Sequence, residues 1–241
     1  MTAAPEQPLV IVLDDDQTVR EALENLIQST GMETACFASA QDLFEAGVLA
    51  RPGCLILDVR MPGASGLDLQ RRLAAAGNPK PIIFLTGHGD IPMTVEAMKA
   101  GAVDFLTKPF REQTLLDAIV VGIETDRARR ARAETVKRHV ERLETLTWRE
   151  HEVLAQVALG RLNKQIAYDL GISEVTVKLH RSNAMRKMEV SSIGDLIRAW
   201  EMLPDRLRHA RARDGDGRGD RPAPGVAVGQ RVRPADLVPL G

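Results

Sequence analysis

Five side chains suited to phosphoryl chemistry follow apolar runs that are typical of strands. Asp14 and Asp15 follow residues 9–13, Asp58 follows 54–57, Thr86 follows 82–85, and Lys108 follows 103–107. A carboxylate can accept a phosphoryl group, a hydroxyl can hydrogen-bond the phosphate and an ammonium group can neutralise its charge. If the runs are parallel strands of one sheet, their carboxyl ends meet at one edge. We therefore expect these side chains to converge.

The apolar runs alternate with segments of helical periodicity, which predicts an α/β fold with a parallel sheet. The runs are almost continuously apolar, as expected when helices cover both faces of the sheet. Gly31, Gly77 and Gly101 follow three of the segments, where a left-handed residue commonly ends a helix. The predicted helices cover residues 19–30, 40–50, 66–76, 92–100 and 112–123.

The acidic residues predict a metal site as well as a nucleophile. Asp14 and Asp15 facing Asp58 would repel one another without a cation, and an all-oxygen ligand set suits Mg²⁺. A structural alternative exists for each residue alone: an Asp run after a strand is often a helix N-cap, Asp58 could occupy a turn, and Lys108 could be a solvated loop charge. The occurrence of all of them at successive strand ends favours the phosphoryl-acceptor interpretation.

The motifs IVLDDDQTVR, LILDVRMPGASG, IIFLTGHGD and GAVDFLTKPF resemble the CheY-like receiver domain of two-component response regulators. The resemblance implies a flavodoxin-like, doubly wound parallel five-stranded sheet over residues 7–125. It further implies a cis peptide bond between Lys108 and Pro109. The implied roles are phosphoacceptor for Asp58, Mg²⁺ ligation for Asp15, Asp58 and the backbone carbonyl of Arg60, a metal-bound water on Asp14, phosphate pairing for Lys108, and switching for Thr86 and Phe105.

Residues 146–200 predict two helices, a tight turn and a third helix, the pattern of a helix-turn-helix. Gly171 stands at the turn and Ser173 is a good N-cap for the helix that follows. On that helix one face is suited to packing and the opposite face mixes cations, a small polar residue and aliphatic side chains. The packing face holds Val177, Ala184 and Met188, and the opposite face holds Val175, Lys178, Leu179, Ser182 and Arg186.

A mixed face of this kind suits the major groove of DNA, although a solvated helix face is the alternative. The charge distribution favours DNA. Residues 1–125 hold 9 Lys/Arg and 17 Asp/Glu, a balance of −8, whereas residues 126–213 hold 19 and 12, a balance of +7. The total net charge of −1 therefore conceals an acidic first half and a basic second half. A basic domain is what binding to DNA phosphates requires.

The second half resembles the LuxR-type helix-turn-helix, and the whole chain resembles NarL/FixJ-type response regulators. The resemblance is carried by LTWREHEVL, NKQIA and EVTVKLH. Trp148 and Ser182 are less typical, since proline or a polar residue is common at the first position and some relatives have lysine at the second. The resemblance implies base contacts from Lys178, Leu179 and Ser182 and backbone contacts from Thr176, His180 and Lys164. Arg186, on the same exposed face, completes the expected DNA-binding set.

The remaining segments complete the expected domain organisation. Residues 126–144, rich in Ala, Arg and Glu, predict a mostly solvated helical linker, and residues 145–203 form the expected DNA-binding domain. From residue 204 onward Arg, Gly, Asp and Pro dominate and apolar periodicity disappears, so we predict a disordered tail over 204–241.

The composition argues against several other kinds of protein. Cys36 and Cys54 lack CxxC spacing and histidine neighbours, so we expect them to pack in the core. Aromatic residues make up only 3% of the chain, too few for the stacking platforms of single-strand binders. No stretch approaches a membrane span and no signal sequence is visible, so we expect a cytoplasmic protein without membrane contact.

These patterns predict a non-enzymatic transcription regulator. A sensor histidine kinase would phosphorylate Asp58, the phosphorylated protein would form a homodimer on double-stranded promoter DNA, and RNA polymerase is a candidate further partner. Release of a helix-turn-helix held against the receiver is an alternative route of activation. An aspartyl-phosphate phosphatase is disfavoured because Asp58-Val59-Arg60 lacks the Asp-x-Asp pattern of such enzymes. A constitutive DNA binder with a receiver that only dimerises remains an alternative.

Overall fold

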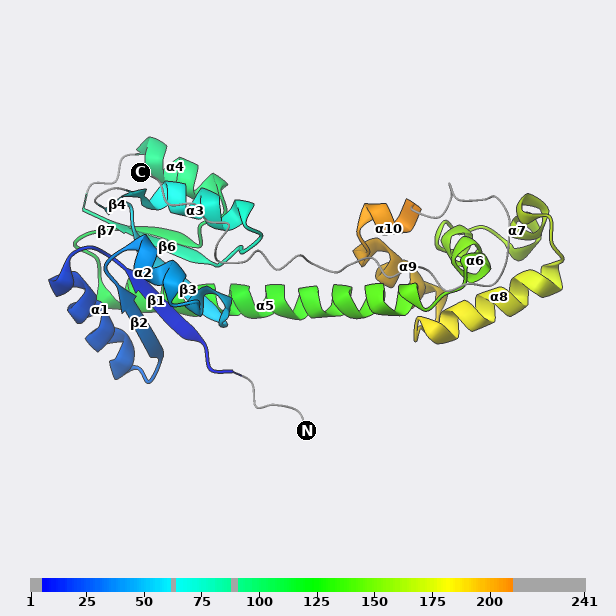
Figure 1. Cartoon of the computed structure of the whole chain (residues 1–241), viewed down its shortest axis with the longest axis horizontal. Coiled ribbons are helices and arrows are strands. Elements are labelled where there is room, and N and C mark those ends of the chain that lie inside the picture. Colours follow the sequence, from blue (N-terminus) through cyan, green and yellow to red (C-terminus); the bar gives the residue numbers. More distant parts are fainter. Residues whose placement is uncertain (1–5, 62–63, 88–90, 210–241) are drawn as a thin grey trace. The chain divides into compact units, whose positions relative to one another are not determined.

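The computed structural model describes residues 6–61, 64–87 and 91–209. The chain divides into two compact units, a first unit that extends to Arg130 and a second unit that begins at Ala131. Figure 1 shows strands and helices together in the first unit and helices in the second. Each unit is described separately below.

The first unit contains a five-stranded sheet whose paired strands are all parallel. The strand order is β2-β1-β3-β6-β7, with β3 at the centre. This order reverses beside β1, which is the topology of a doubly wound sheet, and confirms the predicted fold class. The strands are β1 (Leu9–Leu13), β2 (Glu33–Phe37), β3 (Gly53–Asp58), β6 (Ile82–Thr86) and β7 (Asp104–Thr107). A two-stranded antiparallel pair, β4 (Arg60–Met61) and β5 (Ala64–Ser65), follows β3.

Helices cover both faces of this sheet because alternate strand residues point to opposite sides. Leu9, Ile11 and Leu13 pack on one face with Leu43 of α2 and Leu73 of α3. Val10 and Val12 pack on the other with Leu23 of α1, Ile27 of α1 and Ile119 of α5. The helices are α1 (Gln17–Ser29), α2 (Ala40–Glu45), α3 (Gly66–Ala75), α4 (Ile91–Lys99) and α5 (Glu112–Glu144).

Two predicted helices differ in extent from those observed. The segment predicted as one helix over 40–50 is α2 followed by a short 3-10 helix, η1 (Val48–Ala50), because Gly47 between them has a left-handed φ of 64°. The helix predicted over 112–123 and the helical linker predicted over 126–144 are one continuous helix, α5, of 33 residues from Glu112 to Glu144. The expected glycine ends of three helices are present, since Gly31, Gly77 and Gly101 all have positive φ.

The second unit packs α6 (Trp148–Ala158), α7 (Asn163–Leu170), α8 (Glu174–Lys187) and α9 (Ile193–Met202) around one core. Leu143 from the end of α5 is buried in that core, beside Leu154, Val177 and Trp200. The prediction of a disordered tail from residue 204 is wrong at the start of that tail, because Asp205–His209 form α10 and Leu207 packs against the core. A helix of five residues is too short to give a periodic apolar pattern in the sequence. Residues 210–241 of that tail lie outside the described part of the chain.

In the described residues, no helix combines the length and the apolar character needed to cross a membrane. Cys36 and Cys54 are free thiols that pack with the core on the α1 side of the sheet. Burial raises the pKa of Cys54 to about 12, so its thiol stays protonated.

Candidate functional site

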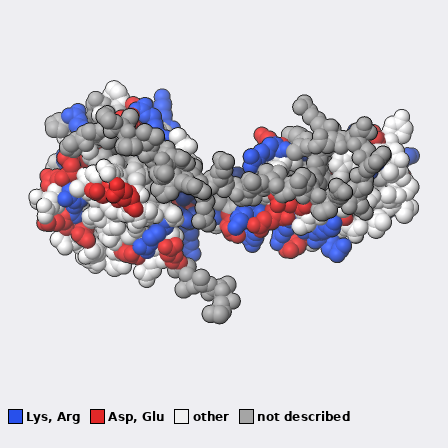
Figure 2. Space-filling model, in the orientation of Figure 1, with Lys and Arg blue, Asp and Glu red and all other residues white. Residues whose placement is uncertain are grey.

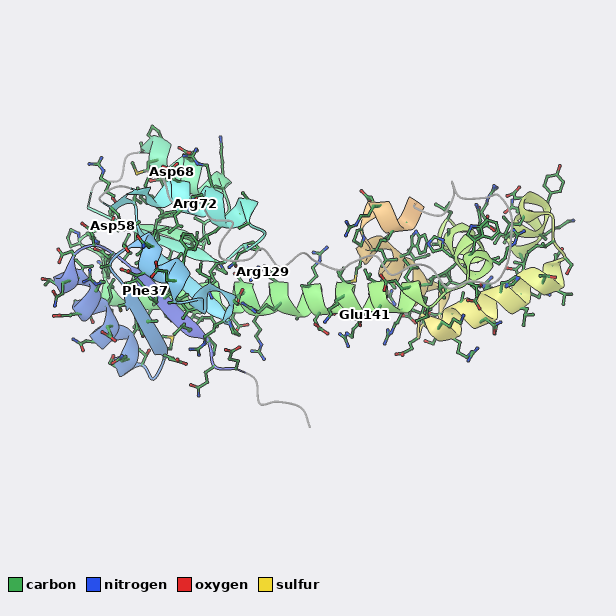
Figure 3. All side chains as sticks on the ribbon, in the orientation of Figure 1. Phe37, Asp58, Asp68, Arg72, Arg129 and Glu141 are labelled. Carbon is green, nitrogen blue, oxygen red and sulfur yellow. The ribbon has the colours of Figure 1, made fainter. Side chains whose placement is uncertain are left out.

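The predicted phosphoryl-acceptor residues converge at the carboxyl edge of the sheet. Asp58 is the last residue of β3, Thr86 is the last residue of β6, and Lys108 follows β7 directly. Asp14 and Asp15 follow β1, the neighbour of β3. Backbone hydrogen bonds continue the ladder past the strand ends, because the Lys108 N–H donates to the Thr86 carbonyl at 2.7 Å. Figure 3 labels Asp58 in its place on the first unit.

The acidic cluster consists of Asp14, Asp15 and Asp58. One carboxylate oxygen from each residue lies within 4.8 Å of the others. Asp14 is 2% exposed, whereas Asp15 is exposed and Asp58 is intermediate. The neighbouring Asp16 has the alternative role considered for the whole acidic run, since its side chain caps the N-terminus of α1 by accepting from the N–H groups of Thr18 and Val19.

Lys108 joins two of these carboxylates. Its Nζ lies 2.7 Å from Asp14 Oδ2 and 3.3 Å from Asp58 Oδ2. Burial by itself would lower the pKa of Lys108, but the hydrogen bond and charge of Asp14, together with Asp58, reverse this effect and raise it. Lys108 is therefore held as a cation. The peptide bond that follows it, to Pro109, is cis, as the resemblance implied.

The donor set fits a hard divalent cation. The cluster has three carboxylates and Lys108 contacts two of them, so negative charge remains for a metal to neutralise. Oxygen ligands at a partly exposed edge suit Mg²⁺, which retains several waters. The backbone of Arg60 adjoins this cluster, because its N–H donates to Asp58 Oδ1 at 3.2 Å. The arrangement can hold a cation while leaving an Asp58 oxygen accessible to a phosphoryl donor.

Thr86 lies on β6, the neighbour of β3, and Phe105 lies on β7, which pairs with β6 at the edge of the sheet. Thr86 is 1% exposed and lies at the same edge of the sheet as Asp58 and Lys108. Phe105 is half-buried and its ring centroid lies 6.0 Å from that of Phe84. The paired residues Thr86–Thr107 and Phe84–Phe105 belong to the same ladder, so both predicted switch residues lie on one pair of strands.

The candidate DNA-binding residues lie on α7 and α8 of the second unit. Lys178, Leu179, Ser182 and Arg186 are exposed, and Leu179 is 59% exposed despite its apolar side chain. Thr176 and His180 are half-buried on one flank of α8, and Lys164 is exposed on α7. All the predicted side chains therefore belong to one helix and the start of the helix before it. In Figure 2 acidic and basic side chains both appear on the visible face of each unit.

Local interactions fix the orientation of α8. Gly171 ends α7 in a left-handed conformation, with φ of 65°, and Ser173 Oγ accepts a hydrogen bond from the Thr176 N–H at 3.1 Å. Val177, Ala184 and Met188 are fully buried, which confirms the predicted packing face. The opposite face is therefore held outward.

Sequence reasoning missed two residues beside this surface. Arg181, half-buried on α8, donates from its guanidinium to Asn163 Oδ1 at 3.0 Å. Asn163 lies within the NKQIA motif, which was used only to identify the domain. The helical spacing of Arg181 from Lys178 was the available signal, because residues three apart share a helix face.

Comparison with known families matches both halves of the chain. Residues 10–120 match the response regulator receiver domain, and residues 144–200 match the bacterial regulatory proteins of the luxR family. Nodulation protein W of Bradyrhizobium diazoefficiens is 49% identical over 86% of this chain and 92% of its own length. Response regulator protein TodT of Pseudomonas putida is 53% identical over 83% of this chain and 88% of its own length.

Solved structures extend the similarity to the fold. The response regulator StyR is 50% identical, with a TM-score of 0.69, over 81% of this chain and 98% of its own. Full-length FixJ from B. japonicum is 36% identical, with a TM-score of 0.51, over 82% of this chain and 97% of its own. Both contain the two parts in one chain, as the covered lengths show.

Proposed function

The chain belongs to the two-component response regulators of the NarL/FixJ type, with a receiver domain and a LuxR-type DNA-binding domain, and we propose that phosphorylation of Asp58 controls its binding to promoter DNA. The proposed receiver is 7–125, the linker 126–144 and the DNA-binding domain 145–203, with residues 204–241 as a tail. The proposed phosphoryl donor is a sensor histidine kinase, and the proposed place of action is the cytoplasm.

The observation that carries the proposal is the contact of Lys108 with both Asp14 and Asp58. A nucleophilic carboxylate needs a cation beside it to accept a dianionic group, and Lys108 is in contact with Asp58 before phosphorylation. An oxygen of Asp58 would attack the phosphorus of a phosphohistidine, forming the P–O bond while the P–N bond breaks and the imidazole leaves. Asp58 becomes an acyl phosphate, and Lys108 pairs with its oxygens.

Mg²⁺ at Asp14, Asp15 and Asp58, with the Arg60 carbonyl as a further ligand, would neutralise charge on the transferred group. The remaining residues respond to the new phosphate. The Thr86 hydroxyl would move toward it and bond an oxygen, and Phe105 would reorient into the space released on that side of the sheet. These two residues therefore couple Asp58 to the surface formed by α4 and β7.

The output we propose is dimerisation through the α4 and β7 surface, which would place two α8 helices on one DNA duplex. Two-fold related recognition helices read half-sites about one helical turn apart. Lys178, Leu179, Ser182 and Arg186 would face the major groove, while Thr176, His180 and Lys164 would contact the backbone. RNA polymerase is a candidate partner of the bound dimer.

Intact-mass spectrometry tests the proposed phosphoacceptor directly. The full-length protein is incubated with Mg²⁺ and acetyl phosphate, beside Asp58→Ala and a matched Asp68→Ala control on α3, where the carboxylate pairs only with Arg71 among the described ion pairs. We expect one phosphoryl addition on the wild type and the control and none on Asp58→Ala. A phosphorylated Asp58→Ala protein would show that another residue is the acceptor.

A further inference from the structure

A depression on the second unit lies beside the proposed recognition helix. Its walls include the cations Lys178, Arg181 and Arg186 and the hydroxyl residues Ser182 and Ser191. Within the part of the chain that the structure describes, no Asp or Glu lines it. The basic depression, as we call this surface of Lys178, Arg181, Arg186, Ser182 and Ser191, therefore concentrates positive charge and hydrogen-bond donors without an internal counter-charge.

Several cations elsewhere on this unit pair with acidic partners. Arg149 pairs with Glu152, Arg161 with Asp169, and Lys187 with Glu150, at 2.9, 2.8 and 2.6 Å. Among the described residues, no such ion pair joins a carboxylate to any of the three cations of the basic depression. Convergent like charges repel one another, so this arrangement favours an external anion.

Arg181 is the preorganised member of the group. It is half-buried, and its donation to Asn163 Oδ1 at 3.0 Å fixes one side of the guanidinium. A guanidinium group has five N–H donors in a planar fork, so others remain to bind an oxyanion. An arginine that is already oriented loses less side-chain entropy on binding than a freely rotating one.

The position of Arg181 on α8 distinguishes it from the predicted DNA contacts. It follows Thr176 by five positions, which is about 140° around an α-helix. The major groove is roughly as wide as a helix with its side chains, about 12 Å, so the two flanks of an inserted helix approach different strands. The flank of Thr176 and His180 would approach one strand, and the flank of Arg181 the other.

We propose that the Arg181 side of the basic depression binds a backbone phosphate of the DNA strand opposite to the one approached by Thr176 and His180, with Arg181 as the principal ligand and Asn163 as its positioning residue. This inference rests on the proposed DNA-binding function. It assigns Arg181 to affinity and register rather than to base recognition, because phosphate contacts carry no direct sequence information.

The salt dependence of DNA binding tests this site in the full-length protein, phosphorylated beforehand with Mg²⁺ and acetyl phosphate. The probe is a mixed-sequence duplex of about 30 base pairs, long enough to cover two half-sites a helical turn apart. The Arg181→Met variant is compared with Arg198→Met, which removes the same charge from an exposed arginine of α9 that pairs with Asp195. We expect Arg181→Met to weaken binding about tenfold and to reduce the slope of log affinity against log salt by about 0.9 per protomer. Arg198→Met should keep the wild-type slope.

A second pair of variants tests the geometry of the Arg181 guanidinium and its positioning by Asn163. Arg181→Lys retains the charge without the fork and should keep the slope while weakening binding several-fold. Asn163→Ala should weaken binding in the wild-type background and have no effect when Arg181 is already Met. A wild-type slope in Arg181→Met would overturn the phosphate site while leaving DNA binding intact. Failure of the phosphorylated wild type to bind the duplex would overturn both this site and the proposed function.

Discussion

At the scale of single residues, the three carboxylates of the acidic cluster have different physical roles. Asp14 is almost fully buried and depends on Lys108, whose ammonium group lies 2.7 Å away. Asp15 is exposed, so water compensates its charge. Asp58 lies between these extremes and has an oxygen 3.3 Å from Lys108. The environments of the three carboxylates therefore differ, and the proposed nucleophile, Asp58, is neither the most buried nor the most exposed of them.

Replacing Asp15 by Asn should separate repulsion from metal binding. One fewer negative charge within the cluster should raise the free energy of unfolding in metal-free buffer by up to about 1 kcal/mol, because the site is partly solvated. The same change should reduce the additional stabilisation that Mg²⁺ gives to the wild type. Urea unfolding with EDTA and with Mg²⁺ measures both effects. Equal Mg²⁺ stabilisation of variant and wild type would show that Asp15 is not a ligand.

Lys80, which lies just before β6, should make the folding stability depend on pH because its charged group is buried. Its ammonium group donates to the Arg51 carbonyl at 2.6 Å, yet burial lowers its pKa from 10.5 to about 8. Between these values the unfolded chain holds the proton and the folded protein does not, so folding stability from this group increases as pH rises from about 8 to 10.5.

The Lys80→Met variant should lack that increase. At pH 7, where Lys80 is charged in both states, we expect the variant to be more stable than the wild type by roughly 1 to 3 kcal/mol, since it buries no charge. The difference should shrink toward pH 10. Urea unfolding at several pH values measures this difference in stability. The control is Lys99→Met, which replaces an exposed lysine of α4. Parallel stability profiles for Lys80→Met and wild type would contradict the assigned pKa.

At the scale of elements, α5 stays attached to the first unit beyond residue 125, where the predicted receiver ends. Asp126 is fully buried and accepts from the Gly53 N–H at 2.9 Å, while Arg129 and Arg130 pair with its carboxylate. Burial alone would raise the pKa of Asp126, but these donors outweigh it and lower the pKa. Arg129 is labelled on α5 in Figure 3. The first residues of the predicted linker are therefore part of the first unit's structure.

Removing the Asp126 carboxylate should destabilise the first unit selectively. We expect Asp126→Ala to lower its free energy of unfolding by about 3 kcal/mol, because two arginines and a backbone N–H lose a buried partner. Glu124→Ala, which removes an exposed partner of Arg127 on the same helix, should cost less than about 0.5 kcal/mol. Both tryptophans lie in the second unit, so circular dichroism should reveal an early transition that their fluorescence does not follow. A single unshifted transition would contradict this role of Asp126.

The elements also show what sequence patterns can and cannot predict. Strand ends with Asp58, Thr86 and Lys108 were predictable because chemistry and apolar runs coincide there. The Asp126–Gly53 contact was not, since it joins residues 73 positions apart and depends on how α5 packs. The helix over 126–144 was also predictable, because Ala and Arg favour a helix and Glu does so as well. Arg181 was missed because the sequence does not show whether a cation on a helix is half-buried or fully solvated.

At the scale of the whole molecule, the two halves have complementary charges and separate tasks. The receiver half carries a balance of −8 and the DNA-binding half a balance of +7 over residues 126–213. An acidic receiver does not itself attract DNA, so control of DNA binding needs a change in how the DNA-binding units are presented. The proposed dimerisation would provide that change, because two linked sites bind one duplex far more tightly than one site does.

The most direct test of this account is sedimentation velocity of the full-length protein with Mg²⁺ and acetyl phosphate, beside Asp58→Ala and protein without donor. We predict that the phosphorylated wild type sediments as a dimer, while the untreated protein and Asp58→Ala remain monomers at the same concentration. Intact mass measured on the same samples identifies the phosphorylated fraction. Equal sedimentation of Asp58→Ala and a fully phosphorylated wild type would contradict the proposed switch.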